Sequence, residues 1–520
     1  MKYIEIFDST LRDGAQGEGI QFSLVDKLEI VRALDALGVA YIEAGNPGSN
    51  KKDMAFFEEM RSVPLQNAKL VAFGATRRRG IEAADDPNCR SLLAAGTPCV
   101  CVFGKSWTLH VTEVLRATLE ENLEMVRDTV RFFKDAGKEV IFDAEHFFDG
   151  YKADPGYALS VLAAAANGGA DCLCLCDTNG GCFPDEIYEM VSKVVARFPE
   201  PMRVGIHCHR DTGNAEANSV MAVKAGAVQV QGVYAGFGER CGNAALTTVI
   251  PNLQLKLGCL CIPPENMGLL TETARRICEI ANINPDAQAP YVGSSAFTHK
   301  AGMHIDGVSK NSISYEHVSP ELVGNERRFL MSEVAGRGAL LAALRKVAPE
   351  LDKNAPEATQ LVELLKQMEF EGYQFEAAEA SFELLVRRRL GQKPHFFDLQ
   401  SYRVLNEQDS GCTAVVKLSV DGRTKLSAAE GDGPVHAMDV ALRKALEGFY
   451  PCLRKMRLID YKVRVLESRD ATAAKVRVLI QSTDGADIWT TIGVSANIIE
   501  ASWAALTDSI ECKLIKEQGV

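Results

Sequence analysis

The feature that most limits the fold is an alternation of short β-rich runs with helical stretches over the first half of the chain. Eight β-rich runs follow one another, at residues 3–7, 39–43, 70–73, 99–103, 139–142, 171–176, 203–207 and 228–231. Helical segments separate them, such as residues 25–37 and 112–136. This alternation favours parallel strands joined by crossover helices. Eight repeats within about 260 residues suit a closed (β/α)8 TIM barrel, so we predict an α/β chain that begins with one.

An open doubly wound sheet is the alternative for such an alternation. That fold usually has fewer strands and a glycine-rich first turn. The first turn of this chain is acidic and carries an arginine, in the segment DSTLRDGAQ. The barrel is therefore the preferred prediction.

Reactive side chains follow the ends of the predicted strands. A (β/α)8 barrel gathers its functional residues at the C-terminal ends of its strands. The candidates after strands 1, 2, 5, 6 and 7 are Arg12, Asp13, Glu43, Glu145, His146, Asp177, Thr178, Asn179, His207 and His209. The loop GFGERCGN follows the eighth strand. Together they predict one active site at this end of the barrel.

Two histidines of the seventh strand form a candidate metal site. His207 and His209 are two residues apart, so both side chains point to the same face of a strand. Closure of the barrel brings the turn after the first strand, with Asp13, close to them. Two imidazoles and a carboxylate leave coordination positions open and suit Mn²⁺, Mg²⁺, Fe²⁺ or Zn²⁺. An ordinary pair of strand histidines is the alternative.

The fifteen cysteines do not indicate a disulfide framework. The chain starts MKYIEIFDST, with no apolar signal core, so we expect reduced thiols and a cytoplasmic protein. Cys172, Cys174 and Cys176 share one strand face and are interpreted as core residues. The net charge of -12 predicts no nucleic-acid partner. No apolar stretch of about 18 residues exists, so no membrane partner is expected.

The rest of the chain divides into two further regions. We predict a catalytic barrel at residues 1–262, helical linker subdomains at 263–384 and a C-terminal regulatory domain at 385–520. The linker contains the loop HKAGMHIDGV, and helices are predicted at residues 333–347 and 356–368.

The regulatory domain contains an internal βββα duplication. The elements of the two copies are predicted at residues 397–405, 413–420, 423–429 and 435–449, and then at 459–467, 473–482, 487–493 and 497–508. Small-residue turns, GDGP and GVSAN, precede the two helices. They are either ordinary helix starts or sites for a small ligand.

Four separated segments carry a resemblance to a known family. FDSTLRDGAQ, the HCH pair, GFGERCGN and HKAGMHIDGV resemble the acyl-transferring enzymes that include 2-isopropylmalate, homocitrate and citramalate synthases. The duplicated domain resembles the leucine- or isoleucine-sensing regulatory domain of these enzymes. The resemblance implies a metal-dependent acyltransferase that condenses acetyl-CoA with a 2-keto acid. It also implies a domain-swapped homodimer.

The resemblance also implies the roles of individual residues. The implied metal ligands are Asp13, His207, His209 and Asn243, for Mn²⁺ or Mg²⁺ with Zn²⁺ and Co²⁺ as alternatives. Arg12 matches the residue that steadies the keto oxygen, and Thr178 the one that holds the substrate carboxylate. Glu145, His304 and Tyr315 match the groups that transfer protons. The sequence does not decide between Glu145 and His304 as the base.

These assigned residues each have a structural alternative. Arg12 could serve in an ion pair, Glu145 as an acid at a helix start and Thr178 as a helix N-cap. His304 and Tyr315 could instead pack outside the site.

Three further segments bear on the choice of keto acid. EAGNPGSN, FDAEHFFDGYK and SWTLHVTEVL, which contains His110, are most similar to the pyruvate-using members of the family, which act in isoleucine biosynthesis. 2-Isopropylmalate synthases tend to carry phenylalanine in place of Asn46 and serine in place of Asp143. We expect His110, Phe103 and Asp143 to bind the substrate, with Phe103 and Asp143 at the border of the pocket for the keto-acid side chain. 2-Isopropylmalate synthase, which uses 2-ketoisovalerate in leucine biosynthesis, and homocitrate synthase are the alternatives.

Two other classes are weighed. A lyase of the HMG-CoA type uses a similar barrel and metal set, but it lacks a duplicated domain such as residues 385–520. A non-catalytic amino-acid sensor would not need Arg12, Asp13 or Glu145. The condensing enzyme is therefore the preferred prediction.

Overall fold

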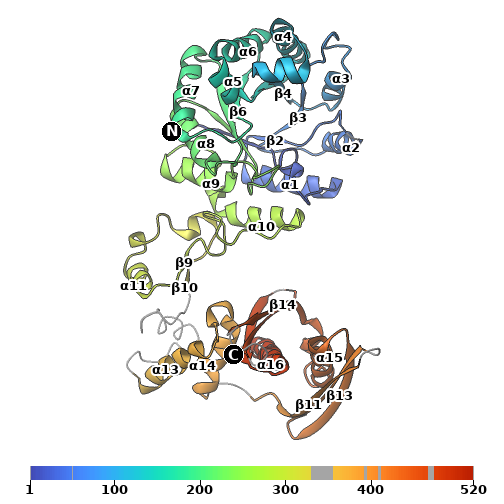
Figure 1. Cartoon of the computed structure of the whole chain (residues 1–520), viewed down its shortest axis with the longest axis vertical. Helices are drawn as coiled ribbons and strands as arrows, with labels where there is room; N and C mark the ends of the chain where they lie inside the picture. The colour runs from blue at the N-terminus through green and yellow to red at the C-terminus, as the bar shows by residue number, and fades with distance from the viewer. Residues whose placement is uncertain are drawn as a thin grey trace. The chain divides into compact units, whose positions relative to one another are not determined.

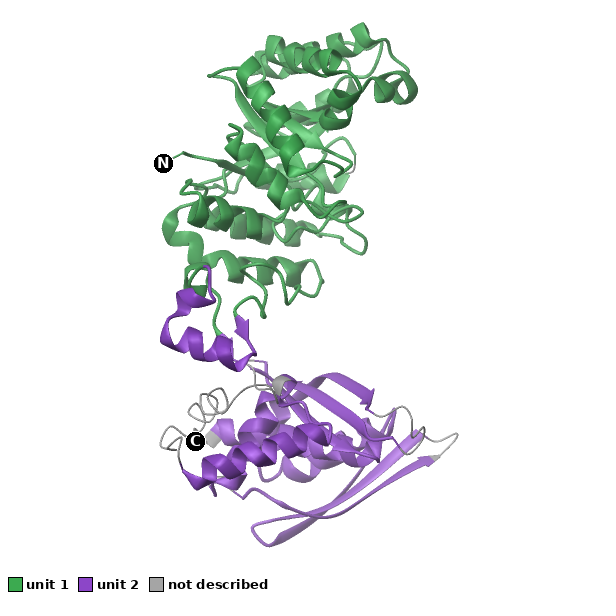
Figure 2. Ribbon diagram, turned by 60° about the vertical axis from the view of Figure 1, so that its left-hand side comes forward, with its two compact units in different colours: residues 1–297, 318–327 green, residues 298–317, 328–520 purple. Residues whose placement is uncertain are grey.

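The computed structural model describes residues 2–49, 51–329, 355–391, 395–407, 411–466, 474–485 and 487–518. The predicted helix at residues 333–347 lies outside these ranges. Contacts divide the chain into two compact units, which Figure 2 shows in different colours. The first unit comprises residues 1–297 and 318–327, and the second comprises residues 298–317 and 328–520. The three predicted domain ranges cut the chain elsewhere and stay a prediction.

The first unit contains a closed barrel of eight parallel strands in sequence order (Figure 1). Its strands are β1 (Glu5–Asp8), β2 (Tyr41–Glu43), β3 (Lys69–Ala75), β4 (Cys99–Lys105), β5 (Glu139–Glu145), β6 (Cys172–Asp177), β7 (Arg203–Cys208) and β8 (Gln229–Gly232). Each predicted run overlaps one of these strands. The predicted barrel is confirmed.

Helices surround this barrel in the order that the alternation predicts. They are α1 (Leu24–Leu37), α2 (Lys51–Met60), α3 (Pro87–Ala94), α4 (Leu119–Asp135), α5 (Phe147–Ala153), α6 (Pro155–Gly168), α7 (Pro184–Arg197), α8 (Ala215–Lys224), α9 (Leu246–Pro251) and α10 (Leu270–Ile280). Local sequence sets the ends of α1. Ser23 and Asp26 form a capping box before it, and Gly38 ends it with a φ of 97°.

The predicted helix at residues 112–136 is wrong at its N-terminal end. A π-helical segment, His110–Leu115, comes first and stops at Arg116, whose φ of 55° is left-handed. The helix α4 starts only after Thr118, whose hydroxyl accepts a hydrogen bond from the Glu121 N–H. Because a threonine N-cap starts a new helix at this point, the predicted helix covers parts of two elements, the π-helical segment and α4.

The barrel interior has its own small apolar cluster. Cys172, Cys174 and Cys176 of β6 lie in it with Phe7 and Tyr41, and all five are buried. The interpretation of these cysteines as core residues agrees with this. Outward-facing strand residues pack against the helices in a larger cluster.

Charged groups close the N-terminal end of the barrel. Arg203 forms ion pairs of 2.6 Å with Glu5 and with Glu139, and its guanidinium also donates to the Tyr41 hydroxyl at 3.0 Å. Lys69 forms an ion pair of 2.6 Å with Glu139. Each charge in this network therefore has an opposite partner.

The second unit begins with short elements. They are β9 (Thr298–His299), which pairs in parallel with β10 (Arg328–Phe329), and the helices α11 (Gly302–Lys310), α13 (Pro356–Phe370) and α14 (Glu379–Arg389). The predicted helix at residues 356–368 is confirmed by α13. Among the described helices of the whole chain, none has the length and apolar composition needed to cross a bilayer.

Two βββα repeats complete the second unit. The first is β11 (Asp398–Glu407), β12 (Gly411–Val420), β13 (Arg423–Gly431) and α15 (Pro434–Leu446). The second is β14 (Arg457–Val465), β15 (Val476–Thr483), β16 (Ile488–Ser495) and α16 (Ile498–Gln518). Each forms a three-stranded antiparallel sheet, and one apolar cluster contains residues of both. The predicted duplication is confirmed.

Candidate metal centre and active site

A cavity of about 240 Å³ lies at the C-terminal ends of the barrel strands. It is lined by Arg12, Asp13, Gln16, Phe73, Phe103, Asp143, Glu145, Cys176, Thr178, His207, His209, Glu239 and Arg240. Every one of these residues belongs to the first unit. Eight of the predicted site residues line this single cavity.

Asp13, His207 and His209 come together at the wall of this cavity. His207 Nε2 lies 3.2 Å from Asp13 Oδ2, and His209 Nε2 lies 3.9 Å from the same oxygen. All three side chains are buried. Parallel pairing of β1 with β8 and of β8 with β7 brings Asp13, in the turn after β1, beside the two histidines.

Asn243, in the loop after β8, lies beside these three residues, and we call the four residues together the metal group. Its Oδ1 lies 3.1 Å from His207 Nε2, and a β-bridge joins its backbone to His209. Asn243 is fully buried, which agrees with its predicted place beside the histidines. The sequence resemblance, and no pattern of spacing, indicated this residue.

The charges of the group differ from those of the free side chains. Burial alone would raise the pKa of Asp13, but Arg12, His207 and His209 lower it well below its ordinary value. Burial and the neighbouring His207 lower the pKa of His209 to about 3. Near neutral pH, Asp13 is therefore an anion and His209 a neutral imidazole, the forms in which both bind metals.

The donor set fits a divalent cation. Two imidazoles, one carboxylate oxygen and one amide oxygen suit Mn²⁺, Mg²⁺ or Zn²⁺. Within the described part of the chain, the buried atoms His209 Nδ1 and Asn243 Nδ2 have no hydrogen-bond partner. Buried polar atoms are normally paired, so this group is left incompletely satisfied by the protein's own side chains.

Arg12 is held in place on three sides. Its Nε donates to Glu43 Oε2 at 2.6 Å, and its Nη1 lies 3.3 Å from Asp13 Oδ2. Its guanidinium carbon stands 3.9 Å from the ring centroid of Phe73. A charge held rigidly beside the metal group can stabilise an oxyanion without reorganisation. Glu43, which the sequence indicated only as an acid at the end of a strand, orients the Arg12 guanidinium.

Glu145 and Thr178 face the cavity from neighbouring strand ends. Glu145 closes β5 and forms an ion pair with Lys105, the last residue of β4. The Thr178 hydroxyl accepts a hydrogen bond of 2.9 Å from the His146 N–H. Thr178 is not a helix N-cap, because the following helix α7 has Phe183 in that position. Arg240 donates to the Thr178 carbonyl at 2.7 Å. Sequence reasoning had not singled out Lys105 or Arg240.

Two of the residues expected at the keto-acid pocket, Phe103 and Asp143, line the cavity, and a third, His110, does not. Phe103 stacks on Phe73 with ring centroids 5.1 Å apart, and Asp143 lines the cavity near them. His110 is not among the lining residues. It lies in the π-helical segment, where it stacks on Trp107 at 5.2 Å and lies 4.2 Å from the ring of His146. Its predicted contact with substrate stays a prediction.

His304 and Tyr315 belong to the second unit, whereas the cavity is lined from the first. Their rings stack on each other with centroids 4.2 Å apart, and both side chains are exposed. Their predicted role as proton-transfer groups from a partner subunit is neither confirmed nor contradicted by this arrangement.

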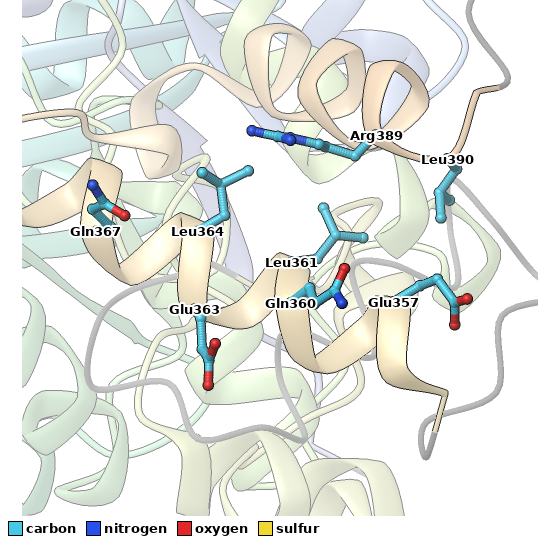
Figure 3. A pocket seen from close by; sticks show the side chains of 8 residues that line it. All are labelled: Glu357, Gln360, Leu361, Glu363, Leu364, Gln367, Arg389 and Leu390. Carbon is cyan, nitrogen blue, oxygen red and sulfur yellow. The ribbon is translucent and has the colours of Figure 1, made fainter.

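A second cavity, of about 390 Å³, lies in the second unit between α13 and the end of α14. Figure 3 shows Leu361 and Leu364 on the side of α13 that faces Arg389. Its lining contains glutamate, glutamine, leucine and arginine side chains, but neither histidine nor cysteine. Among the described residues, the candidate metal-ligand groups of histidine, cysteine and carboxylate side chains therefore lie in the barrel and not at this second cavity.

Comparison with protein families defines the class. The family model described as HMGL-like matches residues 3–277. Those described as homocitrate synthase post-HMGL domain-like and as the LeuA allosteric (dimerisation) domain match residues 291–372 and 376–514. The chain thus combines an HMGL-like barrel with a LeuA-type C-terminal domain.

Curated relatives narrow this class to one family. The chain is 54% identical to an (R)-citramalate synthase of Aquifex aeolicus, over 99% of this chain and 98% of the relative. It is 49% identical to one of Synechocystis, over 97% and 95%. A probable 2-isopropylmalate synthase of Methanopyrus kandleri is 32% identical, over 98% and 97%. The chain therefore belongs to the (R)-citramalate synthase family, which confirms the resemblance seen in its motifs.

Proposed function

We propose that this protein condenses acetyl-CoA with pyruvate and water to give citramalate and CoA, as a step towards isoleucine. The observation that carries the proposal is the group of Asp13, His207 and His209 in a cavity that also holds Arg12. Nearly full-length similarity to five (R)-citramalate synthases supports the choice of reaction.

The metal would be held by Asp13, His207, His209 and Asn243. A divalent cation bound there acts as a Lewis acid on the keto group. Mn²⁺ or Mg²⁺ is the preferred ion, since a carboxylate and an amide oxygen join the imidazoles. Zn²⁺ and Co²⁺ are the alternatives.

The other residues of the cavity act on the substrate itself. Arg12, fixed by Glu43, places positive charge where the keto oxygen becomes an alkoxide. Thr178 binds the carboxylate of the keto acid, and Arg240 adds a cation at the same rim. Phe103 and Asp143 border the methyl group of pyruvate. His110, whose ring contacts those of Trp107 and His146, is proposed to bind the substrate from the segment after β4.

A base must remove a proton from the acetyl methyl group, whose acidity is low. Glu145 lines the cavity and is one candidate. His304, stacked on Tyr315, is the other, and it would come from the partner subunit of a domain-swapped homodimer. The match to a dimerisation domain supports an assembly of two chains.

The C-terminal repeats are proposed to sense the product of the route. The family model that matches this region is described as allosteric, which supports a regulatory role. Isoleucine or leucine is the proposed effector. The cytoplasm is the proposed location, since all fifteen cysteines are free thiols.

Release of free CoA thiol tests the proposal directly. The full-length protein is supplied with Mn²⁺, acetyl-CoA and either pyruvate, 2-ketoisovalerate or 2-ketoglutarate. We expect release with pyruvate and less with the two larger acids. No release with any keto acid would refute the condensation, while preference for 2-ketoisovalerate would identify a 2-isopropylmalate synthase. Cleavage of hydroxymethylglutaryl-CoA would point to a lyase.

A further inference from the structure

One buried side chain links the metal group to the keto-acid pocket. Gln231 lies on β8, where its Cα is paired in register with that of His207 on β7. It is fully buried. Its Oε1 lies 2.9 Å from His207 Nδ1, and its Nε2 donates to Asp143 Oδ1 at 2.9 Å. Since Asp143 belongs to β5, which is not adjacent to β8, this side chain crosses the barrel interior.

The direction of these two hydrogen bonds is fixed by their chemistry. A carboxylate only accepts hydrogen bonds, so the NH₂ group of Gln231 must face Asp143. Its carbonyl oxygen must then face His207, and that oxygen also only accepts. His207 Nδ1 therefore carries a proton, and the neutral imidazole presents its lone pair at Nε2.

The lone pair of His207 Nε2 points into a group of other acceptors. Asp13 Oδ2 and Asn243 Oδ1 lie 3.2 and 3.1 Å from it. A metal ion among these three atoms would satisfy all of them, and without one a second proton on Nε2 would take its place. With Nδ1 held by Gln231, Nε2 is the nitrogen that faces the other proposed ligands.

We propose that Gln231 is a positioning residue that holds His207 in its metal-binding tautomer and ties this ligand to Asp143 of the keto-acid pocket. The inference rests on the proposed metal site and extends it to a residue that does not touch the metal. Removing a partner that orients a ligating histidine typically lowers metal affinity or activity by about 10- to 100-fold. A change at Asp143 would reach the metal through the same chain of hydrogen bonds.

The test measures Mn²⁺ affinity of the full-length protein from the electron paramagnetic resonance signal of free Mn²⁺, without substrate. Gln231→Met keeps the length of the side chain and removes both hydrogen bonds, so we expect about 10- to 100-fold weaker binding. Gln229→Met is the matched control. Gln229 lies two residues earlier on β8, is equally buried and contacts Glu5, away from the metal group. It should leave Mn²⁺ affinity unchanged.

A double variant separates hydrogen-bond polarity from packing. In Gln231→Glu with Asp143→Asn, the amide at position 143 donates to the carboxylate at position 231, which still accepts from His207. This variant should regain most of the affinity that Gln231→Met loses. Asp143→Asn alone should weaken Mn²⁺ binding, because it lets the Gln231 amide turn over.

The outcomes distinguish this inference from the proposed function. If the parent protein binds no Mn²⁺, the proposed metal site itself is wrong. If the parent binds Mn²⁺ and Gln231→Met binds it equally well, only the role of Gln231 is overturned. Melting temperatures without metal identify a variant that fails to fold. Should Gln231→Met not fold, unchanged affinity in Asp143→Asn overturns the inference instead.

Discussion

The two ends of the barrel both carry charged groups, which are half-buried and paired at one end and buried and incompletely paired at the other. At the N-terminal end, Arg203 pairs with Glu5 and Glu139, and each partner is matched. At the C-terminal end, Asp13 lies among His207, His209 and Asn243, and atoms of the last two have no partner in the described structure. The same scaffold thus contains a completed network and an incomplete one.

We interpret the paired charges at the N-terminal end as groups that stabilise the fold, and the incompletely paired groups at the C-terminal end as functional ones. A buried ion pair contributes little beyond a well-packed apolar group, but losing one partner is costly. A group with unpaired atoms and shifted pKa values is a candidate functional site. The comparison predicts that changes at the C-terminal end alter catalysis, whereas changes at the N-terminal end alter stability.

The largest effect is expected at the metal group. His207→Ala removes a ligand, and loss of several kcal/mol of Lewis-acid stabilisation corresponds to about a 10³-fold fall in kcat. Thiol release with pyruvate measures it. His436→Ala, an exposed histidine of α15, is the control and should keep full activity. If His207→Ala keeps activity within tenfold of the parent's, the C-terminal end of the barrel does not have the catalytic role that the comparison assigns to it.

Arg203→Met should act on stability instead. It leaves Glu5 and Glu139 without their shared cation, which should lower the free energy of unfolding by about 2 kcal/mol, between the values for an exposed and a buried pair. Urea denaturation measures this change, and kcat of the folded protein should stay within twofold of the parent's. A fall in kcat at unchanged stability would contradict the division between the two ends.

A smaller effect is expected at the pocket wall. Phe103→Ala removes the ring that stacks on Phe73 and enlarges the space beside Asp143. The ratio of kcat/KM for 2-ketoisovalerate to that for pyruvate should rise about tenfold, the effect of one or two methyl groups in an apolar pocket. Leu361→Ala, in helix α13 of the second unit, should leave the ratio unchanged. An equal loss with both acids would mean that Phe103 does not set specificity.

The smallest expected effect is on the pH dependence of stability, through the ionised form of Glu139. Burial raises the pKa of Glu139, but hydrogen bonds from Lys69, Tyr41 and Arg203 outweigh it and lower that pKa to about 2. Its ionised form therefore stabilises the fold above about pH 4.5, and this stabilisation is lost as the pH falls towards 2. Glu139→Gln should be less stable than the parent at pH 6, with the difference shrinking towards pH 2. Denaturant titrations across this range would show a constant difference if the network were not ionic.

Much of the site could be read from residue types at strand ends. Arg12, Asp13, Glu145, His207 and His209 were found because a barrel collects such residues at one end. His110 follows a strand by the same reasoning, yet its ring is turned into a stack with Trp107 and His146. The π-helical segment that carries it has no distinct sequence pattern, and the predicted helix at residues 112–136 missed it.

The sequence by itself determined the barrel, the duplicated C-terminal region and the residue types of the candidate metal site. These depend on local periodicity and on the spacing of residues along single strands. Only the tertiary structure decided which polar groups meet across the barrel, such as Gln231 with Asp143 or Arg12 with Glu43. Such pairs join residues 88 and 31 positions apart. Their meeting depends on barrel closure and on side-chain direction within the interior, which no local pattern encodes.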